Sequence, residues 1–173
     1  VALQPLVDRL TLHLLQGRVL HADETPVAQL NPGNGKTQRA YLWAYRSNDF
    51  ELGPRIIVFD YQTSRSGKHV QNFLNKWQGH LLVDDYSGYK ALFSKTASPC
   101  TELGCWAHAR RKFFDLHQAN ASTIAFEALQ RIGKLYAVEA EGKHSSTEAR
   151  QILRAEKSLP ILQSLHDWLL QTR

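Results

Sequence analysis

The chain has 173 residues, is 43% hydrophobic and 21% charged, and carries a formal net charge of +5. This balance is ordinary for one globular domain, with or without an extension, and its mild basicity permits a polyanionic partner or a merely basic solvated surface. Two cysteines are too few for a disulfide scaffold and favour a reducing cytoplasm. No apolar run reaches the roughly 20 residues of a membrane span, so no membrane partner is expected.

The first part of the chain predicts a helix and then three strands. Apolar residues at helical spacing predict a helix over residues 3–16, which Gly17 ends. A strand is predicted over residues 19–23, closed by Thr25 and Pro26. Turn residues fill positions 31–36, and aromatic and β-branched residues predict strands over 40–46 and 55–61. Short, turn-rich connections between these three strands indicate an antiparallel meander.

The pattern then changes to alternating helices and strands. Helical spacing predicts a helix over 68–77, and the run at 80–83 predicts a fourth strand. Because that helix connects two strands, the fourth strand should run parallel to a neighbour. Residues 101–105 predict a fifth strand, and from Trp106 onward only helix signals follow, with Pro160 expected to kink or divide the last helix.

Two acidic pairs follow apolar runs. Asp23 and Glu24 follow the first strand, and Asp84 and Asp85 follow the fourth. If the two strands are neighbours, one acid of the first pair would lie close to one acid of the second pair. Two such carboxylates can bind Mg²⁺, and the metal ion would support chemistry on a DNA phosphodiester. The alternative is that these acids only form turns or helix caps.

Strand alternation sends Asp23 and Glu24 to opposite faces, so a given metal ion takes only one of them. Asp84 is nearer its strand than Asp85. We therefore predict Asp23 and Asp84 as the ligands, with Asp60, at another strand end, as a weaker competitor.

Other candidate residues are cationic or soft ligands. A structural zinc site is not expected, because the three candidate ligands, Cys100, Cys105 and His108, are irregularly spaced. A helix over 107–117 would place His108, Arg111 and Lys112 on one side, where they are predicted to contact phosphate or to form a solvated basic face. Arg65 and Lys68, close to a helix start, are a second candidate phosphate contact.

Several of these segments together resemble a known family. The segments are residues 21–26 (His-Ala-Asp-Glu-Thr-Pro), 41–43 (Tyr-Leu-Trp), 59–61 (Phe-Asp-Tyr), 64–67 (Ser-Arg-Ser-Gly), 84–89 (Asp-Asp-Tyr-Ser-Gly-Tyr) and 104–114 (Gly-Cys-Trp-Ala-His-Ala-Arg-Arg-Lys-Phe-Phe). Their sequences and order resemble the transposases of the bacterial insertion-sequence-66 family, over about residues 3–141. The last helical stretch matches more loosely.

The resemblance implies an α/β, ribonuclease-H-like mixed sheet with an all-helical C-terminal extension, and a DDE-type centre that uses Mg²⁺ or Mn²⁺. It implies DNA strand cleavage and transfer by a homo-oligomer in the bacterial cytoplasm. The family aspartates fall on Asp23 and Asp84. The Cys-x-x-His of similar transposases falls on Cys105 and His108, close to the active site. From the basic residues themselves we expect DNA contacts by His108, Arg110, Arg111 and Lys112.

The resemblance also implies a division of the chain into a catalytic core over residues 1–118 and a helical insertion over 119–173. The family glutamate lies in an Asn-Asn-x-x-Glu-Arg motif that this sequence lacks. Because the chain has no Met and ends at Arg173, we expect a piece of a longer protein, with the third carboxylate beyond Arg173. The alternatives are a catalytically inactive DNA-binding or oligomerising remnant, and a ribonuclease-H-like nuclease.

Overall fold

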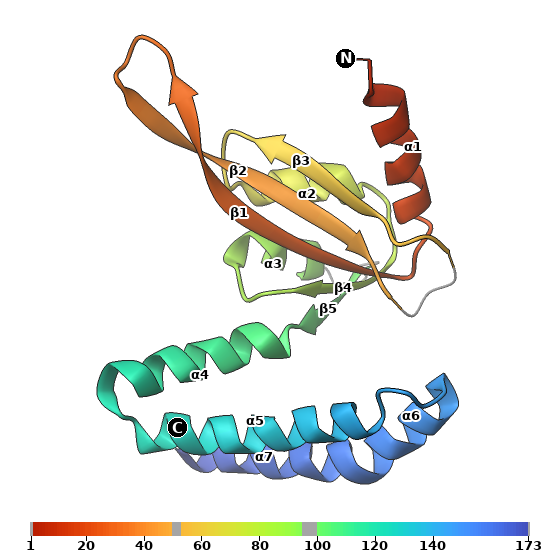
Figure 1. Cartoon of the computed structure of the whole chain (residues 1–173), viewed down its shortest axis with the longest axis vertical. Coiled ribbons are helices and arrows are strands. Elements are labelled where there is room, and N and C mark those ends of the chain that lie inside the picture. Colours follow the sequence, from red (N-terminus) through yellow and green to blue (C-terminus); the bar gives the residue numbers. More distant parts are fainter. Residues whose placement is uncertain (1, 50–52, 95–99, 173) are drawn as a thin grey trace. The chain divides into compact units, whose positions relative to one another are not determined.

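The computed structural model describes residues 2–49, 53–94 and 100–172, and Arg173 lies outside them. The chain forms two compact units, residues 1–105 and 106–173, and each is described by itself. The first unit holds α1 (Gln4–Leu14), β1 (Val19–Asn31), β2 (Lys36–Ser47), β3 (Ile57–Gln62), α2 (Gly67–Leu74), β4 (Gly79–Val83), the 3₁₀ turn η1 (Ser87–Tyr89), α3 (Lys90–Phe93) and β5 (Cys100–Gly104) (Figure 1). The second unit holds α4 (Trp106–Asn120), α5 (Thr123–Glu141), α6 (Thr147–Leu153), the π-helical segment η2 (Arg154–Ser158) and α7 (Leu159–Thr172).

The first unit is built on a five-stranded mixed sheet of strand order β3-β2-β1-β4-β5. Strands β1, β2 and β3 pair antiparallel, and β4 is parallel both to β1 and to β5. The predicted meander, the helical crossover through α2 and the fifth strand are therefore confirmed. The chain is of the mixed α/β class.

The prediction that the first strand ends at Asp23 is wrong. β1 continues through Pro26 to Asn31, and its hairpin with β2 projects past the rest of the sheet (Figure 1). Pro26 is tolerated because β4 pairs only with Val19–His21, so further along β1 one edge is open and needs no N–H donor. The turn at residues 31–36 is confirmed, with Gly33 and Gly35 at positive φ.

One face of the sheet carries the core. Leu20 of β1, Trp43 of β2 and Leu81 of β4 are completely buried on this face, where the amphipathic helix α2 adds Val70 and Leu74. α2 ends at Leu74, three residues before the predicted end, because Asn75 adopts a positive φ. Trp77 therefore lies after the helix, and its indole N–H donates a 2.8 Å hydrogen bond to the carbonyl of Gly17.

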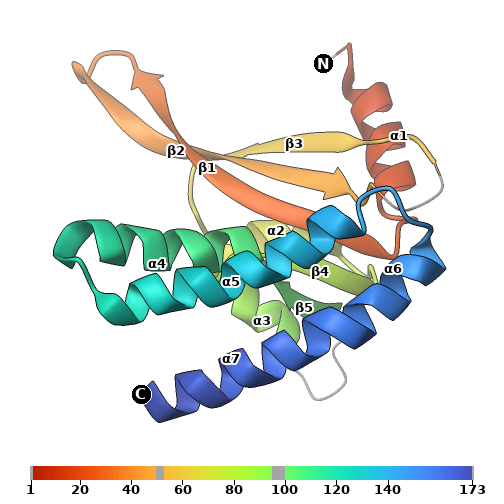
Figure 2. The same ribbon diagram turned by 60° about the horizontal axis from the view of Figure 1, so that its bottom comes forward.

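Across residues 106–172 the second unit contains helices and the short connections between them, as the sequence predicted. α5 buries a stripe of apolar residues, and the Ser122 side chain caps its first turn at the amide of Ala125. Figure 2 shows α5 and α7 as long helices joined through α6 and η2. The break in the last helix that was expected at Pro160 lies just before this residue, in the π-helical segment η2. Pro160 itself lies in the first turn of α7, where a residue without an N–H donor is tolerated.

The two compact units meet in sequence between Cys105 and Trp106. The division into a catalytic core ending at residue 118 and a helical insertion stays a prediction, because it concerns roles rather than compactness. Among the described residues, no helix is both long and apolar enough to cross a lipid bilayer.

Candidate active site and nucleic-acid contacts

The two predicted metal ligands come from neighbouring parallel segments of the chain, β1 and the end of β4. Leu20 pairs with Leu81, and His21 pairs with Leu82. Asp23 lies two residues after His21, within β1, and Asp84 lies two residues after Leu82, one residue beyond the end of β4. Because side chains alternate along a strand and Leu20 and Ala22 are buried, Asp23 belongs to the face of β1 opposite the buried core. That Asp23 and Asp84 share a metal ion stays a prediction.

Asp23 lies within β1, not at its end. It is exposed and pairs across the sheet with Ala44. Its Oδ1 accepts a 3.0 Å hydrogen bond from the amide of Glu24, which orients the carboxylate along the strand. On the same face of β1, burial and then the charge of Arg46 lower the pKa of His21, which favours a neutral imidazole there.

Asp84 is the first residue after β4 and is half-buried. Its Oδ1 accepts a 2.9 Å hydrogen bond from the amide of Tyr86. The neighbouring Asp85 has a different environment, because its side chain is 70% exposed and forms a 3.1 Å ion pair with Lys90. The backbone therefore holds Asp84 in place, whereas Asp85 is neutralised at the surface.

Glu24 forms a buried ionic cluster that the sequence prediction missed. Its Oε1 accepts a 2.9 Å hydrogen bond from Nε of Arg65 and a second bond from the same guanidinium. Its Oε2 accepts a 2.6 Å hydrogen bond from the hydroxyl of Tyr89. Burial and then this bond to Glu24 raise the pKa of Tyr89 far above its usual value, so the hydroxyl keeps its proton.

A signal for this cluster was present in the sequence. Alternation along β1 places Glu24 on the core face with Leu20 and Ala22. A carboxylate buried there requires strong donors, so an arginine elsewhere in the first unit should have been sought as its partner. Arg65, which was predicted to contact DNA, is that partner, and its DNA contact stays a prediction.

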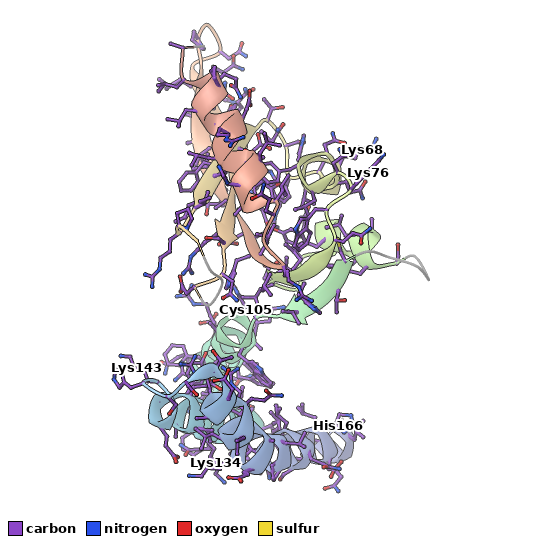
Figure 3. The ribbon with its side chains drawn as sticks, turned by 90° about the vertical axis from the view of Figure 1, so that its right-hand side faces the viewer. Lys68, Lys76, Cys105, Lys134, Lys143 and His166 are labelled. Carbon is purple, nitrogen blue, oxygen red and sulfur yellow. The ribbon has the colours of Figure 1, made fainter. Side chains whose placement is uncertain are left out.

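Among the remaining ligand candidates, Cys105 is joined through its backbone to the end of β4. The amide of Cys105 donates a 3.0 Å hydrogen bond to the carbonyl of Val83, the residue before Asp84. Figure 3 labels Cys105 where β5 gives way to α4. Asp60 lies on the core face of β3, opposite to the face of Asp23, and accepts hydrogen bonds from Gln62.

Apart from Arg65, the predicted DNA contacts lie on two helices in different units. Lys68 is exposed in the first turn of α2 (Figure 3). On α4 the four predicted residues are all exposed, namely His108, Arg110, Arg111 and Lys112. A rotation of about 100° per residue places Arg110 on the other flank of α4 from the remaining three. No described residue of α4 is buried, so this helix offers an open basic surface.

The donor set at Asp23 and Asp84 suits a hard divalent cation. Both are carboxylates, and Mg²⁺ is commonly bound by one or two protein carboxylates with water and phosphate completing its shell. Within residues 2–49, 53–94 and 100–172, no group of three or more His, Cys, Asp and Glu side chains is placed to hold a metal ion. The described residues therefore supply at most two ligands here.

Comparison with known proteins gives a family match over the whole sequence. The family model described as "Transposase IS66 family" matches residues 1–173. Similar curated proteins come from Sinorhizobium fredii (strain NBRC 101917 / NGR234). Uncharacterized protein y4qI is 37% identical over 95% of this chain and 32% of its own length. Uncharacterized protein y4hP is 33% identical over 99% of this chain and 34% of its own length. The chain thus spans about a third of the length of the curated relatives it matches.

Proposed function

Because the chain belongs to the IS66 transposase family, we propose that it is part of a transposase catalytic domain and carries two metal-binding carboxylates for DNA strand cleavage and transfer. The observation that supports this most is the parallel register between β1 and β4, which pairs His21 with Leu82, two residues before Asp23 and Asp84 respectively. Three antiparallel strands followed by parallel ones agree with a ribonuclease-H-like sheet.

Asp23 and Asp84 would hold the metal. When bound, Mg²⁺ or Mn²⁺ supplies Lewis-acid activation of the phosphodiester and of the attacking water or 3′-hydroxyl. The carboxylates supply negative charge in fixed directions, because the amide of Glu24 orients Asp23 and the amide of Tyr86 orients Asp84. Cys105 would lie next to this site, since its amide is bonded to the residue before Asp84.

DNA would be the partner of the basic residues. Each cation on α4 that contacts a phosphate releases counterions, which gives affinity without reading the base sequence. A transposase joins two DNA ends, so the active form would be a homo-oligomer in the bacterial cytoplasm, where DNA is accessible. The position of the third carboxylate would lie outside the described residues.

The alternative is a protein that binds DNA or a second copy without cleaving DNA. It is favoured by the absence of a three-residue metal group among the described residues. A ribonuclease-H-like nuclease is the remaining alternative and differs only in lacking strand joining.

The proposal is tested by incubating a protein that contains this chain together with the segment that carries the third carboxylate with supercoiled plasmid DNA and Mn²⁺. We expect nicks and joined strands from the wild type and neither product from Asp23→Asn. Nicking without joining would favour the nuclease. DNA binding without nicking, in a chain that still binds Mn²⁺, would favour the non-cleaving protein. Nicking by Asp23→Asn at the wild-type rate would refute the assignment of Asp23.

A further inference from the structure

Glu24 is an almost fully buried carboxylate next to a proposed metal ligand. Its side chain is 1% exposed, whereas its ion-pair partner Arg65 is 42% exposed. The guanidinium reaches Glu24 from the loop before α2, and the hydroxyl of Tyr89 reaches it from η1. Three separate segments of the chain therefore meet at this one side chain. A buried charge is tolerated only with such partners, so their geometry is tightly fixed.

The contacts continue from Arg65 to Asp84. The guanidinium of Arg65 stacks on the ring of Tyr86, 3.7 Å from the ring centroid. The hydroxyl of Tyr86 donates a 2.5 Å hydrogen bond to the backbone carbonyl of Arg65. The amide of Tyr86 is the donor that orients the Asp84 carboxylate. Arg65 is thus connected to one proposed ligand through a single residue.

The same cluster is connected to Asp23 through the backbone of Glu24. The amide of Glu24 donates to Asp23 while its side chain is held on the opposite face. The loops involved also touch directly, because a Cβ at Gly67 would lie 2.1 Å from the carbonyl oxygen of Gly88. Only a residue without a side chain fits there, which brings the start of α2 and η1 together.

We propose that Glu24, Arg65, Tyr86 and Tyr89, called here the carboxylate clamp, are positioning residues that fix the mutual orientation of the Asp23 and Asp84 carboxylates. The role in metal binding rests on the proposed function. The geometric role does not, because each link of the clamp is a contact within the first unit. Arg65 therefore acts on the site from within the protein, through Glu24 and Tyr86.

Hydrogen exchange tests the clamp without any metal. Tyr89→Phe removes the hydroxyl that holds Glu24, and Tyr45→Phe is its matched control. Tyr45 is equally buried, and its hydroxyl has no hydrogen-bond partner among the described residues. We expect the amides of Glu24 and Tyr86 to exchange about tenfold faster or more in Tyr89→Phe, as expected for the loss of a hydrogen bond to a charge. The amide of Ser47, bonded to Ile56, should not change.

Equal exchange of the Glu24 and Tyr86 amides in Tyr89→Phe, Tyr45→Phe and wild type would overturn the clamp. A uniform acceleration of all three amides in Tyr89→Phe would also overturn it, since that result indicates a general loss of stability. Arg65→Lys retains the charge but lacks the planar fork of donors. We expect its exchange rates to lie between those of wild type and Arg65→Ala; no difference between the two variants would argue against the guanidinium contacts.

Mn²⁺ titration calorimetry then tests the link to function, at temperatures well below each thermal unfolding midpoint. Tyr89→Phe should bind Mn²⁺ about tenfold or more weakly than wild type, in line with the effect of residues that orient metal ligands, and Tyr45→Phe should bind normally. If the wild type binds no Mn²⁺ while the exchange result holds, the proposed function fails and the clamp stands. If Mn²⁺ binds equally to all variants, the positioning role is refuted although the metal site remains.

Discussion

His21 of β1 pairs with Leu82 of the parallel strand β4, and each is followed two residues later by an aspartate. If this register creates a metal site, removing one carboxylate should weaken it. We predict that Asp84→Asn lowers Mn²⁺ affinity by more than the roughly 10–100-fold that loss of a supporting residue causes. Isothermal titration calorimetry at constant pH and salt measures this change.

The matched control for that variant is Asp85→Asn. It removes the same charge one residue further along, from a carboxylate that is exposed and paired with Lys90. We expect wild-type Mn²⁺ affinity for this variant. Equal losses in the two variants would mean that only the total negative charge matters, and the assignment of Asp84 would be abandoned.

The order of elements followed from local patterns in the sequence. The period of two along β1 and the helical spacing in α2 and α5 are properties of neighbouring residues, so the strands, helices and crossover were predictable. The extension of β1 past Pro26 was not. It depends on β4 ending early and leaving one edge of β1 open, which is a property of the assembled sheet.

The geometry of the candidate site was predictable only in part, and its metal ligands stay predictions. Alternation alone separated Asp23 from Glu24, and proximity to the strand separated Asp84 from Asp85. The partner of Glu24 could not be deduced from spacing, because Arg65 is 41 residues away and reaches it only through the fold. Arg65 was predicted to contact phosphate because its side chain is charged. The spacing of the sequence does not show that this side chain faces a buried carboxylate.

The basic residues of α4 give a prediction about salt. If Arg111 contacts a DNA phosphate, Arg111→Gln should reduce the magnitude of the slope of log affinity against log salt concentration by about 0.9. Fluorescence anisotropy with a labelled DNA duplex at several NaCl concentrations measures this slope. The control is Lys134→Gln, which removes an exposed cation from α5 (Figure 3). The same slope for Arg111→Gln and the wild type would remove Arg111 from the interface.

Two glycines should respond oppositely to alanine. Gly133 lies within α5, and a Cβ there would have no atom within 4 Å. Gly133→Ala should therefore raise the free energy of unfolding by about 0.5–1 kcal/mol, because alanine loses less backbone entropy in a helix. Gly67→Ala should lower it by about 1–3 kcal/mol, because its Cβ would overlap the carbonyl of Gly88.

Urea unfolding followed by tryptophan fluorescence and by circular dichroism measures both alanine variants. The circular dichroism signal is needed because the two glycines lie in different compact units. A neutral Gly67→Ala variant would show that the start of α2 can move away from η1. That outcome would also weaken the case for the carboxylate clamp.

The ion pair between Glu139 and Arg154 gives a prediction about pH. Nε and Nη2 of Arg154 each donate a 2.7 Å hydrogen bond to a different carboxylate oxygen of Glu139. These bonds outweigh burial and hold the pKa of Glu139 below its usual value of 4.5. Because the folded-state pKa is lowered, the stabilisation is complete above the unfolded-state pKa and is lost as the pH falls through the folded-state value.

We therefore predict that Glu139→Gln is less stable than the wild type at pH 7, by less than about 1 kcal/mol because the pair is partly exposed. The difference should shrink once the pH falls below 4.5, where the wild-type carboxylate takes up its proton. Glu156→Gln is the control, since Glu156 is exposed and forms no ion pair among the described residues. Thermal unfolding from pH 7 to pH 3 tests this, and a difference that stays constant over the range would show that the charge of Glu139 contributes nothing to stability.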